Sequence, residues 1–281
     1  MAVTPARRSS LYDLGVWADR TALHEAASQG RTLQVRQLIQ SQASVNMVTV
    51  DNITPLHEAC SQAHVPCARV LLEAGAQVDV RNIHGSTALC NACRSGSVEC
   101  VQLLLQYGAK VNPSLTSLTA SPLHEACIHG KEEIVHLMIV SGAHLEAYDV
   151  HLGPPLHVAC AQGHLKCARL LLLAGAQVNS KKFHQTALHH AAGLHMPDLV
   201  QLLLDFGADV QATDQQGKKA LDFTTPGSPS HACLRLHEGN PLSLQHLCRI
   251  CVRRVLGTRA SKVIGQLDTP HIIQSYLQFS L

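Results

Sequence analysis

Histidine and cysteine are the residues of this 281-residue chain whose number and spacing could support chemistry. The chain contains 19 histidines and 11 cysteines. Imidazole nitrogens and thiolates are the usual zinc ligands, and both groups also serve as nucleophiles or proton carriers. Five histidines recur at a nearly fixed interval: His24, His57, His124, His157 and His189. Such a regular set could hold metal ions, or it could repeat for a structural reason.

Each of these histidines ends a recurring tetrapeptide. The copies are Thr21-Ala22-Leu23-His24, Thr54-Pro55-Leu56-His57, Thr87-Ala88-Leu89-Cys90, Ser121-Pro122-Leu123-His124, Pro154-Pro155-Leu156-His157 and Thr186-Ala187-Leu188-His189. They are 33, 33, 34, 33 and 32 residues apart, and a degenerate seventh copy stands at Lys219-Ala220-Leu221-Asp222. A period of this length indicates one supersecondary unit stacked on copies of itself, which is a solenoid. Function is then expected on a surface.

The residues after each tetrapeptide predict two short helices. Pro at the second tetrapeptide position suits a first helical turn, and the preceding Thr or Ser can cap it. A break follows at Gly30, Ala63, Gly96, Gly130 or Gly163, and then a second apolar helix. This helix is expected to end at a C-capping glycine, which is Gly75, Gly108, Gly142, Gly175 or Gly207.

These features together resemble the ankyrin repeat. The T-P-L-H-x-A motif, the Gly-Ala pair after the second helix and the Val-Asn or Val-Asp that follows recur over about residues 19–225. The resemblance implies an all-α ankyrin-repeat solenoid of helix-loop-helix pairs with β-turn fingers. It also implies that the tetrapeptide histidines are structural and tie neighbouring loops by hydrogen bonds. Cys90 fills one histidine position without disturbing the repeat, so no metal site is expected.

The cysteines could form a disulfide framework or pack as small apolar side chains. Four of them stand six residues after the start of a tetrapeptide, where other repeats carry Ala27 and Ala192. A position that accepts alanine is a packing position. The pairs Cys90–Cys93 and Cys248–Cys251 lie in predicted helices without a second ligand pair, and both are expected to pack. Reduced thiols favour a cytoplasmic location, and the nucleus is a further candidate location.

Composition excludes several classes of function. The net charge is +2, the sequence pI is near 8.1 and aromatic residues make up 3% of the chain, which argues against nucleic-acid binding. The N-terminus lacks an apolar signal-peptide core, and no stretch is long enough to span a bilayer. The chain contains no phosphate-binding loop, nucleophile elbow or zinc-protease motif. We therefore expect a non-enzymatic protein without cofactor or membrane span.

In ankyrin proteins, partners usually lie across the finger tips and the exposed side of the first helices. By this resemblance, the substrate-binding positions of the present chain are Ile53, Ile83, His84, Leu118, Ile128, His129, Val150, His151, Lys182, Phe183 and Leu194. A row of exposed apolar residues suggests a protein partner. The alternative is that some of these side chains pack on neighbouring turns.

The C-terminal region follows a different pattern. Ser243 can cap a helix whose apolar residues fall on one face. The run from Ser243 to Val252 resembles the elongin-binding box of the SOCS-box family. This resemblance assigns elongin binding to Ser243, Leu244, Leu247, Cys248 and Val252. Such an interaction would be a helix in a groove. The alternative is a helix that only closes the end of the solenoid.

A second segment resembles the cullin-contacting box of the same family. It assigns cullin binding to Leu267, Pro270, Ile272, Ile273, Tyr276 and Leu277. Thr269 is the predicted N-cap of a final helix that begins at Pro270. Asp268 replaces the first proline of the L-P-x-P pattern. The resemblance therefore supports cullin recruitment less strongly than it supports elongin binding.

An ankyrin array followed by this block resembles the ankyrin repeat and SOCS box family. The expected segments are an N-terminal cap over residues 1–18, repeats over 19–225, a linker with a short helix over 226–240 and a three-helix SOCS box over 241–281. The resemblance implies a substrate receptor of a ubiquitin ligase that contains elongin B, elongin C, cullin five and a RING subunit. The alternative is an ankyrin scaffold that recruits no ligase.

Overall fold

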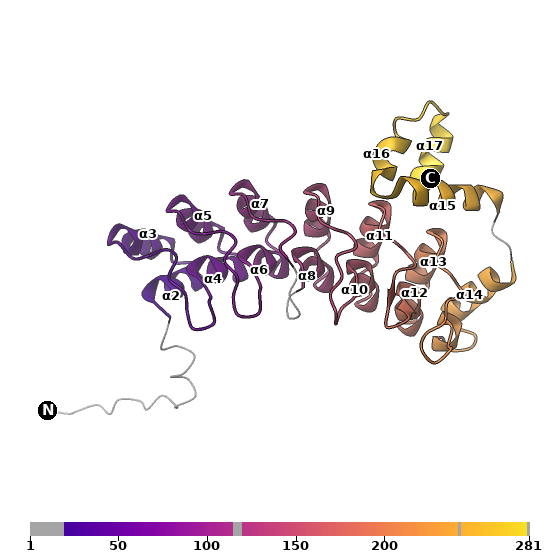
Figure 1. The fold of residues 1–281 in the computed structure, drawn as a ribbon, viewed down its shortest axis with the longest axis horizontal. Helices are drawn as coiled ribbons and strands as arrows, with labels where there is room; N and C mark the ends of the chain where they lie inside the picture. Colours follow the sequence, from indigo (N-terminus) through magenta and orange to yellow (C-terminus); the bar gives the residue numbers. More distant parts are fainter. Residues whose placement is uncertain (1–19, 115–119, 241–242, 280–281) are drawn as a thin grey trace. The chain divides into compact units, whose positions relative to one another are not determined.

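The computed structural model describes residues 20–114, 120–240 and 243–279 (Figure 1). The predicted N-terminal cap, residues 1–18, therefore lies outside the described residues. The chain divides into two compact units between Lys110 and Val111. In each unit, short helices form pairs, with the first helices in one row and the second helices in another (Figure 1).

The first unit contains three helix pairs. Their bounds are α2 (Ala22–Ser28) with α3 (Thr32–Gln40), α4 (Pro55–Ser61) with α5 (Val65–Glu73), and α6 (Ala88–Ser95) with α7 (Val98–Gln106). First helices pack on first helices and second helices on second helices, from α2 to α4 to α6 and from α3 to α5 to α7. This confirms the predicted stacking of repeats within this unit.

The second unit begins with three further pairs of the same kind. Their bounds are α8 (Pro122–Ile128) with α9 (Glu132–Val140), α10 (Pro155–Ala161) with α11 (Leu165–Leu173), and α12 (Ala187–Gly193) with α13 (Pro197–Asp205). A finger precedes α12, in which β1 (Lys181–Lys182) pairs antiparallel with β2 (Gln185–Thr186). Phe183 and His184 form its tip with positive φ angles, as a tight hairpin turn requires.

A shortened seventh pair follows, where the sequence predicted a degenerate seventh repeat and then a linker with a short helix over residues 226–240. The 3₁₀ helix η1 (Ala220–Phe223) packs on α12, and α14 (Pro229–Gly239) packs on both η1 and α13. The Lys219 ammonium lies 2.8 Å from the Glu238 carboxylate and joins the start of η1 to the end of α14. The predicted linker helix is thus the second helix of a repeat, because its apolar residue Leu234 is buried.

The helix boundaries follow the predicted capping chemistry. The Thr54 hydroxyl accepts a hydrogen bond from the His57 N–H at 3.3 Å, with Pro55 at the first helical position of α4. At the end of α5, Gly75 has φ 86° and its N–H donates to the Leu72 carbonyl, while the Ala76 N–H donates to the Leu71 carbonyl. This pair of bonds is the Schellman motif.

The core consists of stacked small and aliphatic side chains. The tetrapeptide leucines and the registered cysteines are almost fully buried, namely Leu23, Leu56, Leu89, Leu123, Leu156, Leu188, Cys60, Cys93, Cys127 and Cys160. All 11 cysteines are free thiols. Packing is thus the role of the repeat cysteines, and the disulfide alternative is wrong. Burial raises the pKa of the Cys127 and Cys160 thiols, which keeps them protonated and unreactive.

The segment predicted as a SOCS box is a three-helix element with its own small core. It comprises α15 (Leu244–Leu256), the 3₁₀ turn η2 (Gly257–Arg259), α16 (Ala260–Ile264) and α17 (His271–Gln278). Ala260, Ile264 and Leu277 are buried together, and three half-buried side chains pack against them: Val252, Leu256 and Leu267.

Candidate interaction surfaces

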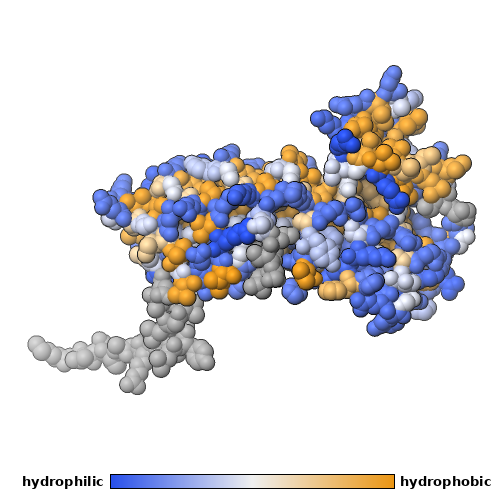
Figure 2. Space-filling view, viewed as in Figure 1, coloured by the Kyte–Doolittle hydropathy of each residue, from blue (hydrophilic) through white to orange (hydrophobic). Residues whose placement is uncertain are grey.

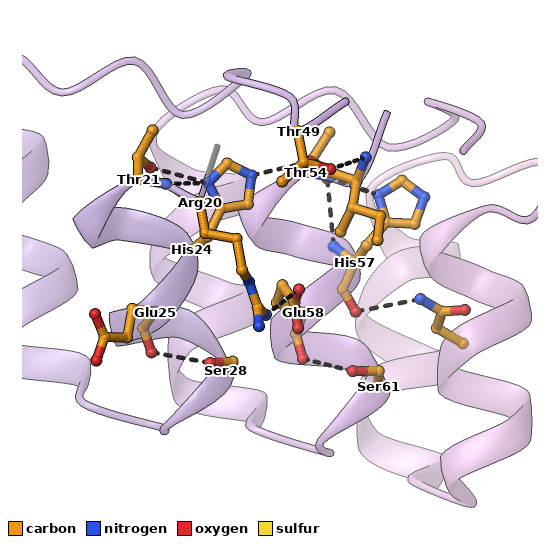
Figure 3. A network of polar contacts seen from close by, with 12 residues as sticks. Arg20, Thr21, His24, Glu25, Ser28, Thr49, Thr54, His57, Glu58 and Ser61 are labelled. Carbon is orange, nitrogen blue, oxygen red and sulfur yellow. Dashed lines mark hydrogen bonds and ion pairs between the residues drawn. The ribbon is translucent and has the colours of Figure 1, made fainter. Parts of the chain in front are cut away.

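Each tetrapeptide histidine bridges its repeat to the finger of the next, and Figure 3 shows His24 and His57 with their neighbours. In all five, the ring Nε2 lies 2.9–3.3 Å from a backbone carbonyl 28 or 29 residues later, as for His24 with Ile53 and His124 with Gly153. Because a carbonyl only accepts hydrogen bonds, Nε2 carries the proton and donates. The bridge positions the backbone of the following finger and occupies Nε2 of each ring.

The other ring nitrogen is also occupied in four of the five repeats. His57 Nδ1 accepts from the Thr54 N–H at 3.2 Å and lies 2.8 Å from the Thr54 hydroxyl, and His24, His124 and His189 repeat this arrangement. Burial lowers the pKa of each of these four histidines. The rings are therefore neutral and structural, which agrees with the expectation from the ankyrin resemblance.

His157 is the exception, because Pro154 stands where the other repeats have Thr or Ser. Proline offers neither an N–H nor a hydroxyl, so His157 Nδ1 is buried without a hydrogen-bond partner among the described residues. Its Nε2 still lies 3.2 Å from the Gln185 carbonyl. Burial, with the neighbouring His190 and Lys182 adding to it, lowers the pKa of His157 to about 4.

The predicted substrate-binding residues lie on the fingers and the ends of the first helices. In the first unit, Ile83 and His84 are exposed and Ile53 is half-buried. In the second unit, exposed positions are His129, Val150, His151, Phe183 and Leu194, and half-buried positions are Ile128 and Lys182. Leu118 lies outside the described residues. None of the ten described residues is buried, and their role in binding stays a prediction.

The exposed face of α15 carries the predicted elongin box. Ser243 caps the helix, because its hydroxyl accepts from the His246 N–H at 3.2 Å. Leu244 is 80% exposed, Leu247 is 46% exposed, and Cys248 is exposed. Figure 2 shows hydrophobic residues gathered over the C-terminal three-helix element. An exposed leucine at the start of an amphipathic helix is typical of a docking helix.

Two predicted contact residues belong to the interior of the box instead. Leu277 is 9% exposed and lies in the core with Ala260 and Ile264, and Val252 packs against the same group. The sequence predicted a docking role for Val252 and Leu277. Spacing along a helix does not show which side of that helix the other helices cover. Cys248 and Cys251 were expected to pack, yet both are exposed.

The predicted cullin box has exposed and half-buried residues. Ile272 is 66% exposed and Ile273 is 45% exposed, Pro270 is exposed, and Leu267 and Tyr276 are half-buried. The predicted N-cap at Thr269 is wrong, because α17 begins at His271 and Pro270 is its N-cap.

The side-chain amide of Gln274 joins the turn before α17 to that helix. It donates to the carbonyls of Leu267 at 2.7 Å and Thr269 at 3.1 Å. Sequence reasoning missed this glutamine, which ties the turn to the final helix.

Sequence reasoning also missed the residues that dock α15 onto the repeats of the second unit. The Arg253 guanidinium is 8% exposed and donates to three backbone carbonyls: Leu173 at 2.7 Å, Leu277 at 3.1 Å and Leu172 at 3.4 Å. It thereby caps the C-terminal end of α11 and holds α17. The spacing of residues along α15 did not reveal that one of its arginines is buried.

An aromatic pair completes this contact. The Phe206 and Phe279 rings are stacked with their centroids 3.9 Å apart. The Arg249 guanidinium lies 3.9 Å from the Phe279 ring centroid and 4.6 Å from that of Tyr276. Phe206 follows α13 and Phe279 follows α17, so residues 73 positions apart fix the box against the repeats.

The described residues contain no cluster of three or more histidine, cysteine or acidic side chains that could bind a metal. Over the same residues, no helix has the length and apolar character needed to cross a membrane.

Comparisons with known proteins match both parts of the chain. The model of the SOCS box matches residues 240–278, and the model of ankyrin repeats (3 copies) matches residues 9–82, 77–149 and 147–214. Among solved structures, the ankyrin repeat domain of human ASB11 superposes with a TM-score of 0.74 at 42% identity, covering 79% of this chain and 100% of that one. The ankyrin repeat domain of Bcl-3 superposes with a TM-score of 0.64 at 28% identity, covering 77% and 98%.

Relatives named for ankyrin repeats and a SOCS box match nearly the whole of this chain. The chain is 58% identical to the mouse and to the human ankyrin repeat and SOCS box protein 13, over 96% of each chain. It is 48% identical to the mouse ankyrin repeat and SOCS box protein 5, over 94% of this chain and 80% of that relative. The chain therefore belongs to the ankyrin repeat and SOCS box family.

Proposed function

We propose that this chain is the substrate-recognition subunit of an elongin–cullin–RING ubiquitin ligase of the cullin-five type. The repeats would bind the target protein, and the SOCS box would bind elongin C, with elongin B alongside, and recruit cullin five with its RING subunit. Ankyrin repeats combined with a SOCS box support a substrate-recognition role in a ubiquitin ligase. The chain itself would be non-catalytic, and its contribution is to hold the target near the recruited enzymes.

The observation that carries the proposal is the unpartnered apolar face of α15. Leu244 and Leu247 extend from a helix whose opposite side is fixed to the repeats through Arg253. Burying one leucine side chain in a partner contributes about 1.5–3 kcal/mol. An exposed leucine on a fixed helix is therefore a pre-organised anchor. The free thiols favour a reducing compartment, so we place the protein in the cytoplasm, with the nucleus as an addition.

The direct test replaces the anchor with charge. The variant Leu244→Glu/Cys248→Glu is expected to lose co-purification with elongins B and C, because a carboxylate in an apolar groove loses its hydration. Leu236→Glu on α14 is the matched control, since Leu236 is also exposed but lies outside the box. Far-UV circular dichroism checks that both variants keep their helices. Retention of elongin by the double variant would contradict the assignment of α15.

Cullin recruitment is tested separately on α17. The variant Ile272→Glu/Ile273→Glu is expected to keep elongin and lose cullin five in the same pull-down, because both isoleucines are exposed and leave the SOCS core untouched. The alternative function, an ankyrin scaffold without a ligase, is favoured by Asp268 in place of the expected proline. In the pull-down, this scaffold function predicts that the unmodified chain binds elongin but not cullin.

A further inference from the structure

Charge is distributed unevenly along the chain, and the SOCS box is its basic part. Residues 241–281 contain four arginines and one lysine, but Asp268 is their only acidic residue. The box alone therefore has a net charge of +4, while the whole chain has +2, which leaves −2 for the remaining 240 residues. An excess of this size on one small element produces a local positive field that the whole-chain charge conceals.

Internal contacts explain two of the five cations. Arg253 is buried against backbone carbonyls, and Arg249 lies over the rings of Tyr276 and Phe279. The other three, Arg254, Arg259 and Lys262, are exposed. No ion pair joins them to a carboxylate within residues 20–114, 120–240 and 243–279. These three side chains form the cationic rim of the box.

The cationic rim adjoins the apolar face described above. Residues three, four and seven positions apart share a face of a helix, and Arg254 stands three residues after Cys251 and seven after Leu247. Arg259 belongs to η2, directly after α15, and Lys262 belongs to α16. An apolar strip with cations along its edge is the composition of an interface whose rim is charged.

We propose that the cationic rim steers the SOCS box onto an acidic surface of the elongin B–C complex, so that association is electrostatically accelerated. This inference rests on the proposed function and names the chemistry of its partner: carboxylates must lie beside the part of the groove that receives the C-terminal end of α15. Rim charges act mainly on the association rate and its salt dependence, whereas a buried anchor such as Leu244 acts mainly on dissociation.

The helix dipole gives the same charges a second role. Arg254 is in the last turn of α15 and Lys262 is in the last turn of α16, where a cation stabilises the C-terminal end. That role changes the stability of the free chain and leaves the association rate untouched. A rate measurement therefore separates the two roles.

The experiment measures association of the full chain with purified elongin B–C by stopped flow over a range of salt concentrations. The variant Arg254→Glu/Arg259→Glu/Lys262→Glu is expected to associate about tenfold more slowly at low salt and to lose the salt dependence, with the dissociation rate changed less than about twofold. The control, Lys110→Glu/Lys166→Glu/Lys218→Glu, carries the same net charge on exposed positions of the repeats and should retain the parent rate.

Three results would overturn the inference. The first is an association rate of the unmodified chain that does not fall with salt, and the second is an equal loss of rate in both triple variants. The third is tighter binding of α15 to vesicles containing phosphatidylserine than to elongin, because basic amphipathic helices also bind anionic membranes. Elongin binding without salt dependence would contradict the steering role of the cationic rim but leave the proposed ligase function intact. Absence of elongin binding would contradict the ligase function as well.

Discussion

At the scale of single residues, the tetrapeptide histidines show how a chemically versatile side chain becomes a structural one. Each is buried, donates from Nε2 to the next finger and is held neutral by burial. Breaking one bridge leaves a carbonyl of the following finger without its donor, which costs about 1–3 kcal/mol. These residues therefore determine the order of the fingers, and the target contacts depend on that order.

His157 gives a pH prediction. The unfolded chain binds this proton near the ordinary pKa of 6.5, but the folded chain binds it only near 4. Between these values the unfolded state binds more protons, so stability is complete above about pH 6.5 and is lost as the pH falls towards 4. From about pH 7.5 to about pH 5, this one histidine should cost about 2 kcal/mol of stability.

The measurement is urea unfolding of the parent chain and of His157→Gln at the two pH values. The variant is expected to lose about 2 kcal/mol less than the parent as the pH falls, whatever its stability at the higher pH. His136→Gln, an exposed histidine on α9, serves as the control. An unchanged pH dependence in the His157 variant would show that another group titrates.

At the scale of elements, the C-terminal glycines of the second helices have two different tasks. All of them have positive φ, but only two lie against α15. A Cβ at Gly175 would lie 2.5 Å from the Gly257 carbonyl oxygen, and a Cβ at Gly207 would lie 2.9 Å from the Ile250 side chain. At Gly142, nothing lies within 4 Å of that position. Repeats five and six thus make room for the SOCS box, while repeat four does not.

This difference supplies a matched pair of variants. Gly142→Ala should cost about 1–2 kcal/mol, because alanine is strained in the left-handed region. Gly175→Ala should cost a similar amount and also displace α15 from α11. Hydrogen exchange of residues 244–256 is the readout, with faster exchange expected in Gly175→Ala alone. Equal exchange in the two variants would mean that α15 is held without the close approach at Gly175.

At the scale of the whole molecule, the proposed target contacts and the proposed ligase contacts belong to different parts of the chain. The fingers and first-helix ends carry the predicted target contacts, and α15 and α17 carry the predicted ligase contacts. A chain truncated after residue 240 should still bind its target but should not shorten the target's half-life, because proximity to the ligase is lost.

Proximity labelling under proteasome inhibition identifies the target for this measurement. The intact chain is compared with Leu244→Glu/Cys248→Glu, and the same proteins should be labelled by both. Their half-lives after arrest of translation should be longer in cells that carry the double variant. Equal half-lives with intact and variant chains would favour the scaffold function over the ligase function.

The sequence by itself determined the repeating part of this protein, because stacking imposes the same demands every 32–34 residues. Caps, helix ends and the packing cysteines follow from spacing, since a position that accepts cysteine in one repeat and alanine in another must face the core. The resemblance of the C-terminal block to the SOCS box could also be read from a short stretch of sequence, because a docking helix presents its anchor residues at helical spacing.

Tertiary structure decided what the non-repeating part does. It paired α14 with η1, buried Leu277 in the core of the box with the half-buried Val252 packed against that core, and buried Arg253 against carbonyls of α11 and α17. These outcomes depend on contacts between residues up to 81 positions apart. Spacing along a helix states which side chains share a face, but only the packing of other helices decides whether that face is covered or left for a partner.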